Sequence, residues 1–215
     1  QQIAHYREKN VEALLRTRIQ QCHNARFIFA GSQRHMMDEM FTSASRPFYQ
    51  SVSIQHLESI PLEAYVPFAS DLFQWYNKRI PADIVESVYE RFNGVTWYLQ
   101  KIMNTLFSMT PNGGEATGKM VEEAIENNVN SYKYSFSETL FRLPSKQKEL
   151  LVAIAKEGAA EAITSAGFVK KHSLSSSSSV QSALKGLLDK DFVTHGKGEY
   201  EVYDKFLAIW LNENY

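Results

Sequence analysis

One segment holds the residue types that contact nucleotide phosphates. Residues 113–120 read Gly-Gly-Glu-Ala-Thr-Gly-Lys-Met, close to G-x-x-x-x-G-K-[ST], the glycine-rich loop that surrounds phosphates. The match fails at Met120, because the hydroxyl that contacts Mg²⁺ in such loops is absent. The context also differs, since a predicted helix and Pro111-Asn112 precede the segment, where a phosphate-binding loop follows a buried strand. We therefore interpret residues 113–120 as a loop within a helical region.

The remaining side chains offer little other chemistry. The six histidines are scattered, with no His-x-x-x-His or Glu-x-x-His pair, and there is no Gly-x-Ser-x-Gly elbow. The one cysteine, Cys22, excludes an internal disulfide and a Cys-x-x-Cys zinc site. No hydrophobic strand ending in paired acidic residues precedes Arg26, so the carboxylate that holds Mg²⁺ in phosphoryl transfer is missing too. We predict no catalytic residue, no metal ligand and no ATP hydrolysis by these residues alone.

The first part of the chain mixes helices with short strands. Residues 3–21 read as a polar helix, and residues 35–42 as a short methionine-rich one. The apolar run 26–32 ends in Gly-Ser and predicts a buried strand, and residues 51–54 alternate like a second strand. Two strands alone do not form a stable sheet. We therefore expect a sheet edge from elsewhere to cover them.

The rest of the chain divides into a helical unit and a winged helix. Apolar residues recur at helical spacing from residue 62 to residue 129, with Gly94 ending one helix. After Pro144 the predicted order is helix, turn, helix and hairpin, with a closing helix at the end. Residues 191–194 and 200–203 are the predicted strands. This order is typical of a winged helix.

A run of serines precedes the clearest amphipathic helix of this region. Residues 175–179 are all serine, and the apolar positions of the helix begin at Val180. One interpretation is a flexible turn whose last serine caps the helix. The other is a set of hydroxyls that contact phosphates, with only Lys170, Lys171 and His172 as basic support.

Composition limits the class of protein. The chain has 215 residues, 44% hydrophobic and 13% aromatic, enough for real cores, and its formal net charge is −1. That charge gives no whole-chain argument for a nucleic acid or an anionic membrane as partner. No apolar run approaches the roughly 20 residues that span a bilayer, and the single cysteine favours a cytoplasmic setting. The chain opens without an initiator Met, and we expect a piece of a longer protein.

Three segments, in order, resemble the archaeal-type ATPases, a branch of the STAND class within the AAA+ proteins. Residues 27–33, Phe-Ile-Phe-Ala-Gly-Ser-Gln, resemble that family's fourth core strand with its sensor-1 end, and residues 46–51 its stretch before the last core strand. Residues 91–99 are similar to the lid motif Gly-x-Pro-x-x-Leu. Residues 200–211 are close to the ending in which a wing strand runs into Asp-x-x-Phe-x-x-Trp.

The resemblance implies a mainly α fold: the remnant of an α/β AAA+ core (1–58), a helical lid domain (59–142) and a C-terminal winged helix (143–215). A nucleotide is clamped between core and lid, and the winged helix reports its state. The cofactor implied is ATP, with Mg²⁺ only in the presence of a missing N-terminal half. The partners implied are ATP or ADP and that missing ATPase core or another protein, with no membrane.

The resemblance also implies site residues. Ser32, followed by Gln33, corresponds to the polar sensor of the γ-phosphate, although Ser32 would equally serve as the cap of the following helix. The family's arginine after Tyr-Gly is replaced, and Arg46 either substitutes for it or is a surface arginine.

The lid residues implied are Gly94, Thr96 and Trp97, where Thr96 replaces the usual proline. That replacement leaves open the backbone shape next to Gly94.

Two classes of function follow. The first is the sensor, lid and winged-helix portion of an ATP-binding switch, and the second is a winged-helix module that binds DNA or a protein without nucleotide chemistry. DNA contacts would involve Lys170, Lys171 and Lys185. Residues 144–215 contain nine Lys, no Arg and nine Asp plus Glu, so this region is neutral and lacks the arginine that reads guanine. We therefore favour an interaction role over tight DNA binding.

Overall fold

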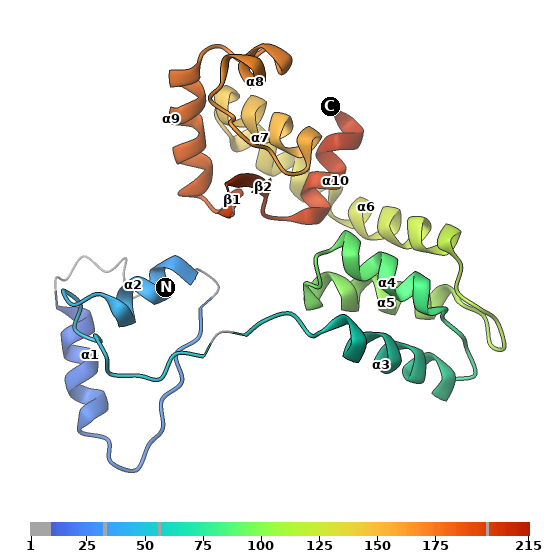
Figure 1. Cartoon of the computed structure of the whole chain (residues 1–215), viewed down its shortest axis with the longest axis horizontal. Helices are drawn as coiled ribbons and strands as arrows, with labels where there is room; N and C mark the ends of the chain where they lie inside the picture. Colours follow the sequence, from blue (N-terminus) through green and yellow to red (C-terminus); the bar gives the residue numbers. More distant parts are fainter. Residues whose placement is uncertain (1–9, 32–33, 56, 197) are drawn as a thin grey trace. The chain divides into compact units, whose positions relative to one another are not determined.

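The chain forms two compact units, Gln1–Glu58 and Ser59–Tyr215. The computed structural model describes residues 10–31, 34–55, 57–196 and 198–215. These residues are mainly helical, with one two-stranded sheet among them (Figure 1). The predicted mainly α fold with a winged helix is confirmed. The division of the second unit into two separate domains stays a prediction.

In its described residues the first unit contains two helices, α1 (Val11–Gln20) and α2 (Arg34–Thr42). Its small core consists of Met40, Phe41 and Phe48, and the Phe29 ring lies 5.2 Å from the Phe41 ring. Helix α2 confirms the helix predicted at residues 35–42. Helix α1 confirms the later part of the helix predicted at 3–21, whose first residues lie outside those described.

Both strands predicted in this unit are wrong. Residues 26–31 and 51–54 form no strand, and Ile28 is 94% exposed. A strand exists only where a neighbouring strand takes up its hydrogen bonds, and no strand in the described part of this unit provides one. Apolar content alone predicted strands here, and the described residues of this unit contain no neighbouring strand to pair with them.

The second unit begins with four helices, which we call the lid helices after the lid domain predicted above: α3 (Leu62–Trp75), α4 (Ala82–Arg91), α5 (Thr96–Met109) and α6 (Gly118–Arg142). Pro61 and Pro81 directly precede α3 and α4, where the fixed backbone of proline starts a helix well. Gly94 lies beyond the end of α4 with φ +67°, and its N–H donates to Tyr89 O at 2.9 Å. Gly94 thus ends α4 as predicted, in a conformation that glycine adopts without strain.

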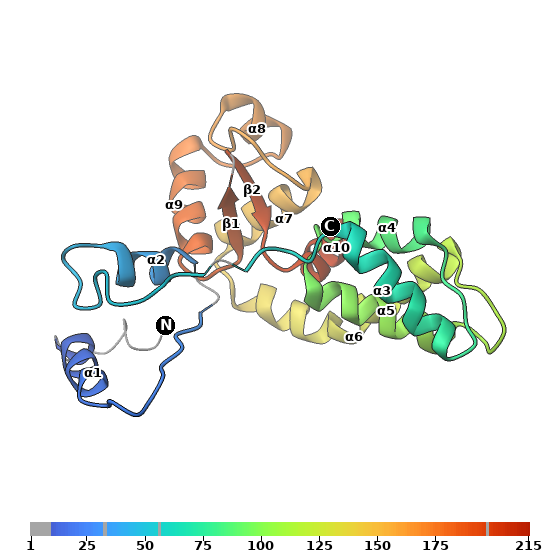
Figure 2. The ribbon, with the colours of Figure 1, turned by 60° about the horizontal axis from the view of Figure 1, so that its bottom comes forward.

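A winged helix completes the second unit. Helices α7 (Ser145–Glu157), α8 (Ala166–Lys171) and α9 (Ser177–Leu188) precede the hairpin β1 (Val193–Gly196) and β2 (Glu199–Val202), and α10 (Lys205–Asn214) follows it (Figure 2). The strands are antiparallel, with Val193 opposite Val202. The first strand begins two residues later than predicted, because Phe192 N donates to Leu187 O at 2.9 Å and Asp191 has φ +57°. These two residues close α9.

The serine run caps α9, but at a different serine than predicted. Ser176 Oγ accepts a hydrogen bond from Ser179 N at 3.2 Å. The backbone of Ser176 is extended, and α9 begins at Ser177. The cap is therefore Ser176, and the prediction that the last serine, Ser179, caps the helix is wrong because the helix starts earlier in the run.

One hydrophobic core runs through the lid helices and the winged helix. It includes Phe73, Val88, Leu99, Ile102 and Leu106 from the lid helices and Leu150, Ile154, Leu187, Phe206 and Leu211 from the winged helix. Helix α6 contributes to this core along its length, from Val121 to Leu140. None of the helices in the described ranges combines the length and apolar character needed to cross a membrane.

Candidate functional site

The predicted nucleotide sensors fall in the first unit. Ser32 and Gln33 lie outside the described residues. Arg46 Nη2 lies 3.1 Å from Glu12 Oε1, and Glu12 is buried on α1. Arg46 Nε is also 3.8 Å from Glu39 on α2. Arg46 is therefore half-buried and its charge is matched inside the unit.

The surroundings of Arg46 contain unsatisfied polar atoms. Glu12 Oε2, Arg16 Nε and Arg46 Nε are buried and have no hydrogen-bond partner among the residues that the structure describes. Arg16 Nη1 also donates to Pro47 O, next to Arg46 in the chain. Buried orphan groups are costly, because they lose hydrogen bonds to water without replacing them. The predicted arginine thus lies in an incompletely satisfied polar cluster.

The segment that resembles a phosphate-binding loop uses its N–H groups internally. Gly113 N donates to Asn77 O at 2.6 Å, and Gly114 N donates to Pro111 O at 2.9 Å. Ala116 N donates to Arg79 O at 2.9 Å. A loop that holds phosphates needs these N–H groups free to point at the ligand. Residues 113–116 therefore do not fit a phosphate.

The end of the same segment begins α6. Thr117 is the N-cap, with its hydroxyl accepting from Met120 N at 3.4 Å. Lys119 is exposed and pairs with Glu123, four residues on, at 3.6 Å. The lysine and hydroxyl thus serve the helix. No group of three or more His, Cys, Asp or Glu side chains in the part of the chain that the structure describes could hold a metal ion.

The predicted lid residues lie at the turn between α4 and α5. A Cβ atom on Gly94 would lie 2.6 Å from Tyr89 Oη, which itself donates to Ile60 O at 2.7 Å. Thr96 is the first residue of α5, a position where proline is favoured because no backbone N–H is needed. The backbone N–H that threonine adds there needs no helical acceptor, so threonine fits this position.

Residues just after this turn contact the start of α10. Tyr98 Oη accepts a hydrogen bond from Lys205 N at 2.9 Å and donates one to Asp204 Oδ1 at 3.3 Å. The same Asp204 oxygen caps α10 by accepting from Phe206 N at 2.9 Å and Leu207 N at 3.2 Å. We call Tyr98, Asp204 and the N–H of Lys205 the latch. It joins a lid helix to the winged helix.

Aromatic rings surround the latch. The Phe92 ring stacks on Tyr98 with centroids 5.3 Å apart, and Phe206 meets Tyr98 edge-on at 5.0 Å. Trp97 lies 5.7 Å from Phe206, and Tyr132 of α6 stacks on Phe206 at 6.2 Å. Phe92 and Phe206 are fully buried, whereas Trp97 is 48% exposed. The resembling segments 91–99 and 200–211 therefore meet in one aromatic cluster.

The latch tyrosine is held in its protonated form. Burial raises the pKa of Tyr98 well above its ordinary value, and the negative charge of Asp204 raises it further. The hydrogen bond from Lys205 N acts in the opposite direction but is smaller. Tyr98 therefore acts as a neutral donor to the carboxylate and adds no charge to the latch beside that of Asp204.

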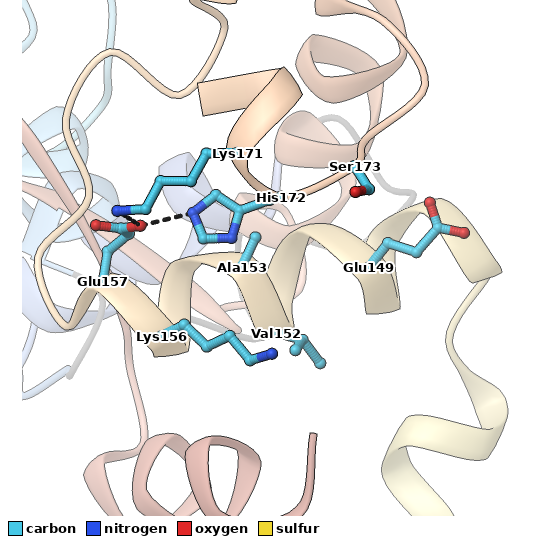
Figure 3. Close-up of a pocket in the computed structure, with 8 residues that line it drawn as sticks. All are labelled: Glu149, Val152, Ala153, Lys156, Glu157, Lys171, His172 and Ser173. Atoms are coloured by element: carbon cyan, nitrogen blue, oxygen red, sulfur yellow. Dashed lines mark hydrogen bonds and ion pairs between the residues drawn. The ribbon is translucent and has the colours of Figure 1, made fainter. Parts of the chain in front are cut away.

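The winged helix has an open pocket of about 470 Å³ between α7 and the end of α8 (Figure 3). On its wall, Glu157 Oε1 lies 2.6 Å from both Lys171 Nζ and His172 Nε2. The hydrogen bond from Lys171, followed by that with His172, lowers the pKa of Glu157. With Glu149 and Lys156 also in the lining, the charges are mixed and select no ligand class.

The residues predicted to contact DNA are not brought together into a basic face. Lys185 is exposed on α9, and Lys170 is exposed near the end of α8. Lys171 is paired with Glu157. The exposed side of α9 otherwise presents serines and glutamine. This surface lacks the concentration of cations that neutralises a phosphate backbone.

Sequence reasoning missed the latch residues as functional groups. Tyr98 and Asp204 lay inside the resembling segments, but no role followed for either. One signal was present: Asp204 directly precedes an amphipathic run, which is the pattern of an N-cap. Nothing local to the sequence indicated that Tyr98 would be its second partner.

The winged-helix region and the chain as a whole are each similar to known proteins. Residues 134–213 match the family model of a probable winged helix domain. Among solved structures, the chain is similar to the Walker-type ATPase PABY2304 of Pyrococcus abyssi, with a TM-score of 0.55 and 17% identity. The similarity covers 79% of this chain and 47% of that one, so the chain spans less than half of the ATPase's length. A search of curated proteins found no match.

Proposed function

We propose that this chain is the sensor, lid and winged-helix portion of an ATP-binding switch of the AAA+/STAND type. The observation that carries the proposal is the similarity of 79% of the chain to part of a Walker-type ATPase. The contact between segments 91–99 and 200–211 supports it, because these segments independently resemble the lid motif and the ending of archaeal-type ATPases. In this proposal a cytoplasmic ATPase closes its lid over ATP and the winged helix reports the closure.

The phosphate-binding and Mg²⁺-binding groups come from outside these 215 residues in this proposal. The internal hydrogen bonds of residues 113–116 support this, since they leave no N–H cradle for a phosphate there. What the chain's own residues contribute is the sensor region and the lid. Arg46 is the cation proposed to face the nucleotide, which would require it to exchange its ion pairs with Glu12 and Glu39 for contacts with phosphate.

Two measurements test the proposal. The coding region upstream of Gln1 is expected to encode G-x-x-x-x-G-K-[ST] and a strand with an acidic end; a complete upstream sequence lacking both would refute the switch. The chain of 215 residues alone is expected to show no Mg²⁺-dependent ATP turnover. Mg²⁺-dependent ATP turnover by this chain would contradict the proposal, because it would require a phosphate site within these residues.

The same chain tests the DNA-binding alternative. Titration of a labelled DNA duplex at low and at physiological salt is the measurement. We expect weak binding at physiological salt, because the winged helix is neutral. Micromolar or tighter binding at physiological salt that falls steeply as salt rises would favour DNA binding instead.

A further inference from the structure

The lid helices and the winged helix are connected twice, through segments far apart in the sequence. The first connection is α6, and the second is the latch between α5 and α10. From these contacts we infer that residues 59–215 move as one rigid body, with no working joint between the lid helices and the winged helix. This inference concerns the chain itself, and its meaning for a switch rests on the function proposed above.

Helix α6 is the first connection. It runs unbroken from Gly118 to Arg142, roughly 37 Å at 1.5 Å per residue. Beyond Gly118 it contains no glycine or proline, the residues at which helices usually kink. Its first half packs in the core at Val121 and Val129, and its second half at Phe136 and Leu140. A single continuous helix resists bending between the two parts.

The latch is the second connection, and it resists rotation about α6. Tyr98 follows the lid turn, whereas Asp204 and Lys205 begin α10, more than one hundred residues later. Two bodies joined by one rod can still twist about it, but a second attachment away from the rod prevents this. Asp204 also caps α10 through Phe206 N and Leu207 N. Movement at the latch would therefore disturb the start of a helix as well.

The aromatic cluster makes separation unfavourable. Phe92 is 0% exposed, Phe206 is 1% exposed and Tyr98 is 9% exposed. Separating α5 from α10 would bring these rings into water and lose the hydrophobic stabilisation of their burial. Joints in proteins are normally exposed segments with few contacts. The passage from α6 to α7 is short, and its Leu143 packs against the core.

A rigid body changes what the winged helix can report. If the lid closes over a nucleotide, the winged helix moves with it through the same rotation. The face of α9 is then presented to a partner in one position for each position of the lid. No separate release of the winged helix from the lid is needed.

Double electron–electron resonance, which measures the distance between two spin labels, tests the inference on the full chain without nucleotide. The exposed Cys22 is replaced by serine, and labels are placed at the exposed Ser87 on α4 and Gln181 on α9. A second pair, Lys119 and Lys133 within α6, is the rigid reference, with backbones about 21 Å apart. We expect one peak for Ser87–Gln181, as narrow as the reference peak. A broad or two-peaked distribution would overturn the inference.

The contribution of the latch is tested in the same labelled background. Tyr98→Phe combined with Asp204→Ala is expected to broaden the Ser87–Gln181 distribution at least twofold, while the Lys119–Lys133 distribution stays unchanged. Tyr134→Phe, at an exposed position of α6, is the matched control and should change neither. An unchanged Ser87–Gln181 distribution in the double variant would show that the latch does not hold the body together. If the double variant unfolds by circular dichroism, Tyr98→Phe alone replaces it, with the same two outcomes. Since no nucleotide is used, these results are separate from the tests of the proposed function.

Discussion

Removal of the latch should weaken the second unit by an amount that its hydrogen bonds define. Asp204→Ala removes the oxygen that caps α10 by accepting from two backbone N–H groups. The same oxygen also accepts the hydrogen bond from the Tyr98 hydroxyl. Loss of the cap costs about 1 kcal/mol, and an orphaned buried hydroxyl costs about 1 kcal/mol more. We therefore expect the free energy of unfolding to fall by about 2 kcal/mol. Asp204→Asn keeps an acceptor oxygen and should cost less than about 1 kcal/mol.

A double-mutant cycle isolates the contact itself. Tyr98→Phe removes one donor and one acceptor, for an expected loss of about 1.5 kcal/mol. Because both substitutions break the same hydrogen bond, the double variant with Asp204→Ala should lose less than the sum, by about 1 kcal/mol. Urea unfolding followed by circular dichroism measures all four proteins, with Tyr134→Phe as the control. Additive losses, with a coupling energy near zero, would refute the latch.

The pH dependence gives an independent test of the same contact. Burial and Asp204 raise the pKa of Tyr98 above its ordinary 10.0. A group whose pKa is raised in the folded state contributes stability that is full below its unfolded pKa and is lost as pH rises beyond it. The stability difference between the wild type and Tyr98→Phe should therefore shrink from about pH 8 to about pH 11. A difference that stays constant over this range would contradict a buried, protonated tyrosine.

Three further substitutions probe local features. Gly94→Ala should lower the free energy of unfolding by about 2 kcal/mol, because φ is +67° and the added methyl would meet a tyrosine hydroxyl. Its control in the same urea unfolding assay is Gly196→Ala, where the added methyl meets open space and should cost less than about 0.5 kcal/mol. Glu157→Gln should remove an acid-sensitive part of the stability. The pKa of Glu157 is lowered from 4.5, so the stability that it contributes is present above pH 4.5 and is lost as the pH falls below it. A wild-type advantage over the variant that persists at low pH would contradict this prediction. Ser176→Ala should cost about 1 kcal/mol by loss of the cap. Thermal unfolding with Ser175→Ala as control checks this, and equal losses in the two variants would argue against a specific cap.

The helices of the second unit were predictable because their signals are local. Apolar residues at helical spacing predicted α9 and α10, and Gly94 predicted the end of α4. The position of the cap was not predictable in the same way. Any residue of the run 175–179 has the hydroxyl that a cap needs. The choice of Ser176 depends on where the preceding loop delivers the chain, with Ser177 Oγ donating to Thr164 O at 2.6 Å.

The strands predicted at residues 26–32 and 51–54 failed for a different reason. Apolar runs report a tendency to be buried, but a strand also needs a hydrogen-bonding neighbour. In the described first unit Phe29 finds burial against Phe41 and Phe48 without any sheet. Sequence reasoning placed the apolar residues correctly in part and assigned them the wrong backbone.

The candidate site could be predicted only as two separate segments. Segment 91–99 and segment 200–211 were each informative through resemblance, but their contact joins residues 106 positions apart. Local periodicity carries no information about such a pair. The aromatic content of both segments was visible, yet it did not indicate that rings from the two segments would contact each other. Only the folded chain shows that Phe206 packs edge-on against both Phe92 and Tyr98.

The neutral charge of the winged helix and its attachment to the lid both favour recognition of a partner through the position of α9. A DNA-binding winged helix needs cations on the face it presents, but Lys171 is bound to Glu157 and the exposed side of α9 is mainly serine and glutamine. Without strong charge, recognition of a partner depends on the position of that face more than on long-range attraction. A face fixed rigidly to the lid has its position set by the lid. We therefore expect variants of the latch to alter partner binding even though no latch residue lies on α9.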